Sequence, residues 1–207
     1  MRFRHALIVF VVLLVGTIVV AATGLDHFLT IHAVACARGT MVGTAAIWFH
    51  RLGPGTMLVF GGGLVILLAP MLRRPWWLAV ALVSSAVVAN RACLLIKVAV
   101  GRLRPWACDL PFLPGVVSES QRATSFPSSH ATTIAALTLA IGLLAPGRWA
   151  VVVAAAAGLA IGALRVFAGA HYASDVLAGW LLGCSIMVAT PALLDRLRGR
   201  LRGVATR

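Results

Sequence analysis

The sequence predicts an all-α protein, a bundle of six transmembrane helices that forms a single domain over residues 1–207. Composition is the first reason. Of the 207 residues, 61% are hydrophobic and 11% are charged, with a mean hydropathy of +0.99, whereas about a quarter of the residues of a soluble domain are charged. The second reason is that the apolar residues gather in runs close to the roughly 20 residues that a helix needs to cross a bilayer.

Six apolar runs mark the predicted spans, and Pro, Gly or charged residues separate them. The spans are residues 6–23, 56–72, 76–100, 130–144, 149–167 and 175–194. The mixed stretch 24–55 predicts short helices at the membrane interface, and 101–129 is the one long polar loop. Glycine pairs four residues apart lie in the last two spans, at 158/162 and 179/183. Such pairs let helix backbones approach closely, and we expect them to pack within the bundle rather than in a dimer.

Charge predicts the orientation of the chain. Its 18 basic and 5 acidic residues give a formal net charge of +13. The basic residues lie between apolar runs and in the tail 195–207, so membrane orientation explains them better than nucleic-acid binding, and no nucleic-acid partner is expected. An excess of Arg in one set of loops places both termini in the cytoplasm. The polar loop then faces the exterior of the inner (plasma) membrane, with Asp26, Asp109, Glu119 and Asp175 on that side.

The cysteines and carboxylates do not predict a metal site or a cofactor. The four cysteines form no CxxC pattern, and neither HExxH nor a carboxylate cluster occurs. Cys36 and Cys108 could meet in an oxidising compartment, but the sequence leaves their pairing open.

Three polar segments lie at the predicted outer ends of spans three to six, where they can converge on one site. They are Lys97–Pro105, Ser125–His130 and Arg165–Asp175. Taken singly, each has a structural explanation: snorkelling cations, helix-capping serines, a satisfied interfacial histidine or an ion pair. These explanations do not account for two histidines, three cations, two serines and a carboxylate at one level of the membrane.

Phosphoryl transfer suits this set of residues. Three cations, Lys97, Arg104 and Arg165, can neutralise the phosphoryl oxygens that carry charge in the transition state. The start of the fourth span offers free N–H groups, to which Ser128 and Ser129 add donors.

The two histidines and the carboxylate supply the remaining chemistry. One of His130 and His171 can attack phosphorus while the other protonates the leaving oxygen. Asp175 follows His171 by four residues, so a helical start to the last span would place both on one face, where the carboxylate orients the imidazole.

In its motifs the chain resembles the phosphatidic acid phosphatase type 2 superfamily, which also contains vanadium haloperoxidases and bacterial acid phosphatases. The motifs of that family are K-x6-RP, PSGH and SR-x5-H-x3-D. The first is complete from Lys97 to Pro105. The second reads Pro-Ser-Ser-His, with Ser129 in place of Gly, and the third begins with Leu164 in place of Ser. The similarity covers a motif core over residues 97–183, and six spans match the small integral-membrane members, including the branch that resembles undecaprenyl-pyrophosphate phosphatases.

The resemblance implies a role for each residue. It implies His171 as nucleophile, Asp175 as its orienter and His130 as general acid. It implies phosphate binding by five residues: Lys97, Arg104, Ser128, Ser129 and Arg165. Neither departure from the motifs removes a charged or nucleophilic group, so we expect activity to survive them.

The hypothesis that follows is a metal-independent lipid phosphatase that forms a phosphohistidine at the outer leaflet and acts on a phosphomonoester or pyrophosphate. Undecaprenyl pyrophosphate is the first-ranked substrate, followed by phosphatidylglycerol phosphate, phosphatidic acid and lipid A phosphates. A lipid phosphotransferase is the alternative within enzymes. A non-catalytic lipid-phosphate-binding membrane protein is the alternative of another class, and it would need the cations but no nucleophile. The sequence leaves the oligomeric state open.

Overall fold

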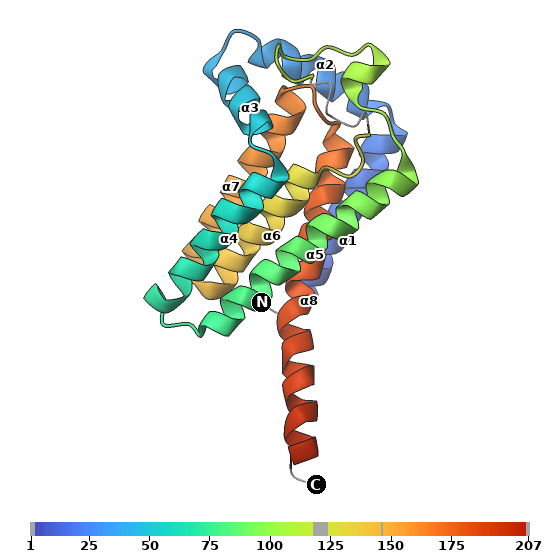
Figure 1. Ribbon diagram of the computed structural model, residues 1–207. Coiled ribbons are helices and arrows are strands. Elements are labelled where there is room, and N and C mark those ends of the chain that lie inside the picture. The colour runs from blue at the N-terminus through green and yellow to red at the C-terminus, as the bar shows by residue number, and fades with distance from the viewer. Residues whose placement is uncertain (1–2, 118–123, 146, 206–207) are drawn as a thin grey trace.

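The computed structural model describes residues 3–117, 124–145 and 147–205 (Figure 1). Glu119, which the charge pattern places on the outer side, and both ends of the predicted domain lie outside these residues. The described part is all-helical, as predicted. Its elements are α1 (Phe3–Ala22), α2 (Leu25–Ala37), α3 (Met41–Arg51), α4 (Pro54–Met71), α5 (Trp76–Val100), the 3₁₀ helix η1 (Pro105–Cys108), α6 (Ser129–Leu144), α7 (Arg148–Phe167) and α8 (Ala173–Ala205).

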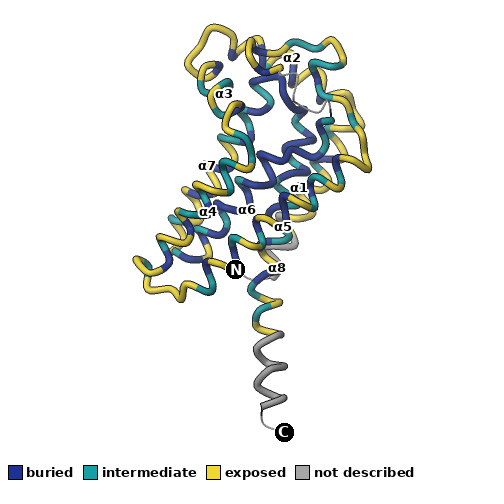
Figure 2. The backbone as a smooth tube through the Cα atoms, viewed as in Figure 1, coloured by how far each residue is buried: buried dark blue, intermediate teal, exposed yellow. Residues whose placement is uncertain are grey.

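Helix α6 is the centre of the bundle. It contacts α4, α5, α7 and α8, while α1 packs on α8. The core between α4, α5, α6 and α8 is built largely from small and branched apolar side chains such as Val65, Leu82, Ala86 and Ala136. Figure 2 shows burial concentrated along α6 and exposure on the outer faces of the surrounding helices.

Those outer faces are apolar. Phe60, Leu95 and Val153 are about as exposed as a side chain on a soluble protein's surface, at 74%, 74% and 67%. Apolar surface of this extent has no place in water, and it is the expected surface of a helix that contacts lipid. Several helices share it, so the chain is a multi-pass membrane protein.

The structure has fewer helices that meet the length and hydropathy of a membrane span than the six that the sequence predicts. Four helices, α4, α5, α7 and α8, are long and apolar enough to cross a membrane, and α1 with α2 adds a fifth if the pair, bent by 89°, counts as one broken span. Helix α6 has 16 residues, which is about 24 Å of helix against a hydrocarbon core of roughly 30 Å. Helices do occupy all six predicted positions, but six spans remain a prediction.

Two glycines of α8 explain how closely α6 and α8 pack. A Cβ on Gly179 would lie 2.7 Å from the carbonyl oxygen of Ser128, and one on Gly183 would lie 2.4 Å from that of Thr132. Backbone atoms cannot yield, so only glycine fits at these contacts. The predicted role of this pair in packing within the bundle is confirmed.

Helices α2 and α3 cover one end of the bundle, as the short helices predicted for residues 24–55. The chain turns by 89° between α1 and α2 at Gly24, whose φ is +74°. A second apolar cluster joins this cover to α7 and to the long loop, through Val34, Ala46, Leu113 and Ala168. Leu164, which replaces the Ser of the family motif, packs against this cluster. The cysteines are free, and Cys36 and Cys108 are both exposed.

Candidate active site

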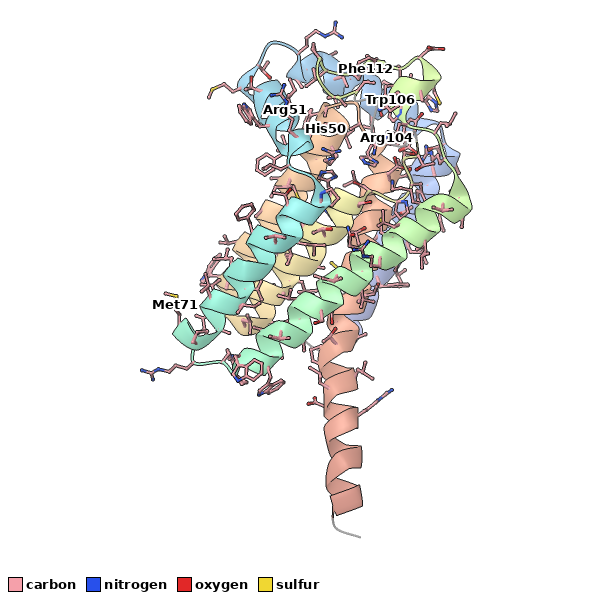
Figure 3. The ribbon with its side chains drawn as sticks, viewed as in Figure 1. His50, Arg51, Met71, Arg104, Trp106 and Phe112 are labelled. Atoms are coloured by element: carbon pink, nitrogen blue, oxygen red, sulfur yellow. The ribbon has the colours of Figure 1, made fainter. Side chains whose placement is uncertain are left out.

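The three polar segments meet at the end of the bundle that α2 and α3 cover, which we call the site end. Here α5 ends, α6 begins, α7 ends and α8 begins (Figure 1). The backbone N–H of Ser128 donates to the carbonyl oxygen of Asp175 at 2.9 Å, which joins the start of α6 to the first turn of α8. In Figure 3, His50 and Arg104 lie at the site end, and Met71 lies at the opposite end.

The cations of the first motif, Lys97 and Arg104, lie on either side of the point where α5 ends, and both contact the loop that returns to α6. Helix α5 ends at Gly101, which has a φ of +65°, a conformation that glycine adopts without strain. Lys97, in the last turn of α5, donates to the carbonyl oxygens of Ser125 at 2.7 Å and Thr124 at 3.2 Å. Nε of Arg104 donates to that of Thr124 at 3.3 Å. Loop carbonyls therefore hold both side chains in place.

Arg165 is the most unusual residue of the site. It lies in the last turn of α7 and has no exposed surface. Within the described residues none of its three guanidinium nitrogens has a hydrogen-bond partner. A buried, unpaired charge costs several kcal/mol. Among the described residues no anion faces these nitrogens, so the arrangement can bind one.

His171 and Asp175 form the predicted pair, but not on a helical turn. Helix α8 begins at Ala173, so His171 precedes it, in a turn whose N–H groups donate to the carbonyl oxygen of Arg165. Nδ1 of His171 lies 3.4 Å from Oδ2 of Asp175, and that same oxygen accepts the N–H of Tyr172 at 3.0 Å. The carboxylate accepts hydrogen bonds only, so Nδ1 of His171 carries the proton. Nε2 of His171 has no partner among the described residues.

The surroundings of His171 hold it neutral. Burial, followed by the positive charges of Arg104, Lys97 and Arg165, keeps the pKa of His171 well below its usual value. Together with the proton on Nδ1, this leaves a lone pair on Nε2. His130 lowers the pKa of His171 in the same way.

His130 lies in the first turn of α6, with its ring stacked on that of His50 at 6.5 Å between centroids. Its Nε2 is 2.9 Å from the carbonyl oxygen of Leu52, in the connection between α3 and α4. A carbonyl oxygen only accepts, so Nε2 is the donor.

The two serines of the second motif differ in role. Ser128 is the N-cap of α6, and its hydroxyl accepts the N–H of Ala131 at 3.4 Å. Ser129 turns its hydroxyl toward α5, where Sγ of Cys93 donates to it at 3.5 Å. The side chain that replaces the family's Gly therefore contacts Cys93. Asn90, one turn earlier on α5, donates to Thr133 at 3.0 Å and packs α5 on α6.

Sequence reasoning missed three polar residues at the site end. They are Asp26 in α2, Arg102 in the loop and Ser174 in α8, which join one another and Asp175 by hydrogen bonds. Arg102 lies inside the first motif, at a position that the motif leaves unspecified. Asp26 is one of only 5 acidic residues in the chain, a rarity that marks it as a candidate.

Comparison with known proteins identifies the class. Residues 74–198, more than half of the chain, match the PAP2 superfamily. The chain therefore belongs to the PAP2 superfamily, and its three motifs fall in the matched part.

Curated relatives are similar over part of their length. The chain is 36% identical over 124 residues to a lipid A 1-phosphatase of Rhizobium johnstonii, covering 58% of this chain and 49% of that protein. It is 36% identical over 130 residues to a decaprenylphosphoryl-5-phosphoribose phosphatase of Mycobacterium tuberculosis, covering 63% of this chain and 65% of that protein. The chain thus matches about half to two thirds of the length of these relatives.

A solved structure shares the fold. The crystal structure of a transmembrane PAP2-type phosphatidylglycerolphosphate phosphatase from Bacillus subtilis superposes with a TM-score of 0.69, over 92% of this chain and 96% of that one. The two sequences are 17% identical, so this similarity concerns the fold alone.

Proposed function

We propose that the chain is a metal-independent phosphatase of membrane lipids that works through a phosphohistidine. One observation carries the proposal: Arg165 is fully buried, and its three guanidinium nitrogens have no partner among the described residues. The N–H of His171 donates to the carbonyl oxygen of Arg165, and Nε2 of His171 likewise has no partner in that part of the chain. A buried cation without a partner calls for an anion, and an unprotonated imidazole nitrogen is a nucleophile. A phosphoryl group satisfies both.

The geometry supports a role for each of three residues. Nε2 of His171 attacks phosphorus, and the bond from phosphorus to the leaving oxygen breaks. That oxygen is the lipid oxygen of a phosphomonoester or the bridging oxygen of a pyrophosphate, and it takes a proton from His130. Asp175 accepts the Nδ1–H of His171 and stabilises the positive charge that the imidazole acquires. Water then attacks phosphorus, His130 takes a proton from this water, and phosphate leaves as the bond to Nε2 breaks.

The remaining polar residues would hold the phosphoryl oxygens. Lys97, Arg104 and Arg165 supply the charge that a divalent cation supplies in other phosphoryl-transfer enzymes. Ser128 and the N–H of Ser129, at the start of α6, supply donors at the positive end of a helix dipole.

An apolar groove supports a lipid as the substrate. It has a volume of about 260 Å³ and runs between α4 and α7 over α6, lined by residues that include Phe60, Ile134 and Ile161. Leu52 lines the same groove, and its carbonyl oxygen accepts the hydrogen bond from His130. The groove thus extends to the residue that holds His130, and its apolar lining suits a long hydrocarbon chain.

Undecaprenyl pyrophosphate is the substrate that we rank first. The relatives described above are a lipid A 1-phosphatase and a decaprenylphosphoryl-5-phosphoribose phosphatase. A further relative, from Sulfolobus acidocaldarius and 28% identical, is an undecaprenyl-diphosphatase. The shared feature is a phosphate ester or anhydride on a long-chain lipid. We further propose that both termini are cytoplasmic and that the site end faces the exterior of the inner membrane.

The test is phosphate release by the detergent-purified protein, with EDTA present throughout. The panel holds undecaprenyl pyrophosphate, phosphatidylglycerol phosphate, phosphatidic acid, a lipid A phosphate and a decaprenylphosphoryl ribose phosphate. We expect release that EDTA does not inhibit and that His171→Ala lacks. An acid-labile, alkali-stable phosphoprotein should form with labelled substrate in the wild type and not in the variant. Turnover retained by His171→Ala, or abolished by EDTA, would contradict the mechanism.

A further inference from the structure

Arg102 links two carboxylates that lie far apart in the sequence. Its Nη2 donates to Oδ2 of Asp26 at 2.8 Å, and its Nη1 donates to Oδ1 of Asp175 at 3.1 Å and to the hydroxyl of Ser174 at 2.7 Å. Its guanidinium also lies over the ring of Tyr172, 4.0 Å from the centroid. Arg102 therefore donates to protein groups, in contrast to Arg165, whose side chain has no partner in the described part of the chain.

Asp26 brings α2 into this network. It lies in the first turn of α2, outside the matched residues 74–198, and it is buried. Its Oδ1 accepts the backbone N–H of Ser174 at 2.9 Å, and its Oδ2 accepts the hydroxyl of the same residue. Asp26 thus holds the first turn of α8, the turn that carries Asp175.

The two oxygens of Asp175 are divided between partners. Oδ1 accepts a hydrogen bond from Arg102, whereas Oδ2 accepts from the backbone N–H of Tyr172 and from Nδ1 of His171. The hydrogen bond from Nη1 of Arg102 to Oδ1 restricts rotation of the carboxylate and so helps to keep Oδ2 directed at His171. The orientation of the histidine depends in this way on Arg102.

Charge balance explains why a second carboxylate is present. Arg102 alone would neutralise Asp175 and weaken its effect on the imidazolium. With Asp26 as a second partner, the group of two carboxylates and one guanidinium keeps one negative charge beside His171. Burial lowers the pKa of Arg102, but the carboxylates of Asp175 and Asp26 outweigh this effect and raise it above its ordinary value, so the guanidinium stays charged.

We propose that Arg102 and Asp26 are positioning residues that hold Asp175 for the reaction of His171, and that α2 thereby completes an active site whose motifs all lie in the family core. The inference rests on the proposed function. Neither residue touches the phosphoryl group; each acts through Asp175.

The test compares three variants with the wild type, using pH profiles of kcat/KM for the preferred lipid. Asp26→Asn removes one negative charge and keeps the shape, Arg102→Gln removes one positive charge, and Arg102→Lys keeps the charge without the fork. Asp109→Asn is the matched control, since Asp109 lies in the loop at the site end with a φ of +57°, which Asn tolerates.

The charged and titratable groups around His171 come from every neighbouring element, and the profile reports their sum. They are Asp26 from α2, Lys97 from α5, Arg102 and Arg104 from the loop, His130 from α6, Arg165 from α7, and Tyr172 and Asp175 at the start of α8. Only one of these changes in each variant.

We expect kcat to fall by about 10-fold to 100-fold in Asp26→Asn and Arg102→Gln, with KM within about 2-fold because the phosphate cations are intact. The acid limb of the profile should move to lower pH in Asp26→Asn and to higher pH in Arg102→Gln. Arg102→Lys should keep the limb near the wild-type position and recover part of kcat, and Asp109→Asn should match the wild type.

A misfolded fraction that is the same at every pH lowers the height of the profile and leaves the position of its limb unchanged. Limbs at the wild-type position in both Asp26→Asn and Arg102→Gln, or a change in KM alone, would overturn the positioning role. An inactive wild type, or an active His171→Ala, would instead overturn the proposed function. The two failures are thus distinguishable.

Discussion

Nε2 of His130 donates a hydrogen bond to the carbonyl oxygen of Leu52, 2.9 Å away. The donor belongs to the second motif, whereas the acceptor lies in a connection between α3 and α4 that precedes the matched residues 74–198. The contact fixes the ring of the proposed general acid from outside the family core. It also fixes where the proton of that ring lies before a substrate enters.

The proposed acid role of His130 predicts a dependence on the leaving group. His130→Gln keeps an N–H donor for Leu52 but cannot transfer a proton. We expect kcat for a lipid phosphate to fall by about 10²-fold to 10⁴-fold, because an alkoxide is a poor leaving group. For p-nitrophenyl phosphate, whose leaving group needs no proton, the loss should be much smaller. Equal losses on both substrates would show that His130 serves another step.

Because Arg165 is a buried cation, we expect its replacement to raise the stability of the protein and to abolish its activity. Arg165→Met removes a buried charge without partners and retains most of the volume, so the free energy of unfolding without phosphate should rise by about 1–4 kcal/mol. Phosphate release should be lost. Thermal unfolding in detergent gives the first quantity, with Arg148→Met, an exposed position on the same helix, as control.

Stabilisation by inorganic phosphate is a second test of an anion site at Arg165. At 100 times its dissociation constant, phosphate should stabilise the wild type by about 2.7 kcal/mol, and it should leave the unfolding temperature of Arg165→Met unchanged. A destabilised variant that phosphate still protects would contradict an anion site at Arg165.

His171 predicts the behaviour of the enzyme in acid. Burial and the charges of Arg104, Lys97 and Arg165 hold its pKa well below the usual value, which is about 6.5 in an unfolded chain. The unprotonated ring is the nucleophile, so the acid limb of kcat/KM should lie below pH 6.5. Arg104→Gln removes one positive charge and should move that limb upward. A limb at or above pH 6.5 in the wild type would contradict the neutral resting state.

The same shift has a consequence for stability. Between the lowered pKa of His171 and about 6.5, the unfolded chain binds a proton that the folded chain does not. Protonation of His171 therefore does not reduce the free energy of unfolding above pH 6.5, and it reduces this free energy increasingly as the pH falls below 6.5. Thermal unfolding without phosphate, measured from pH 8 downward, should show the decline, and His171→Asn should remove that part of it.

The helices of this fold were predictable because a membrane span is a long, continuous run of apolar residues, which is visible in the sequence. The ends of the spans were less so. Helix α8 continues to Ala205, beyond the predicted end at residue 194, because Leu and Arg in the tail are good helix formers and no Pro or Gly-rich stop follows. The 89° bend at Gly24 sets α2 across the site end, and local composition holds no signal for its angle.

The site was predictable where motifs carry it and not where long-range contacts do. His171 and Asp175 are four residues apart, and their pairing needed only local reasoning. Asp26 and Arg102 are separated by 76 residues, and the residues around each of them in the sequence give no indication that the two pair. The carbonyl oxygen of Leu52 is a backbone group that any residue would offer, so no residue type could reveal it.

The groove between α4 and α7 predicts how the enzyme selects its lipid. Ile161 lies on α7 and lines the groove, where it is half-buried. Ile161→Trp should fill part of the volume of about 260 Å³. We expect KM for undecaprenyl or decaprenyl substrates to rise by about 10-fold, since a few lost methylene contacts are worth 1–3 kcal/mol.

A short-chain phosphate separates this effect from damage to the reacting groups. Its kcat and KM should stay at the wild-type values in Ile161→Trp, because the phosphoryl site is untouched. The matched control is Leu159→Trp, two residues earlier on α7, where the side chain lines a different apolar pocket that faces α1 and α8. If Leu159→Trp raises KM for the long-chain lipid and Ile161→Trp does not, the hydrocarbon chain lies between α1 and α7 instead, and the connection through Leu52 to His130 has no part in its binding.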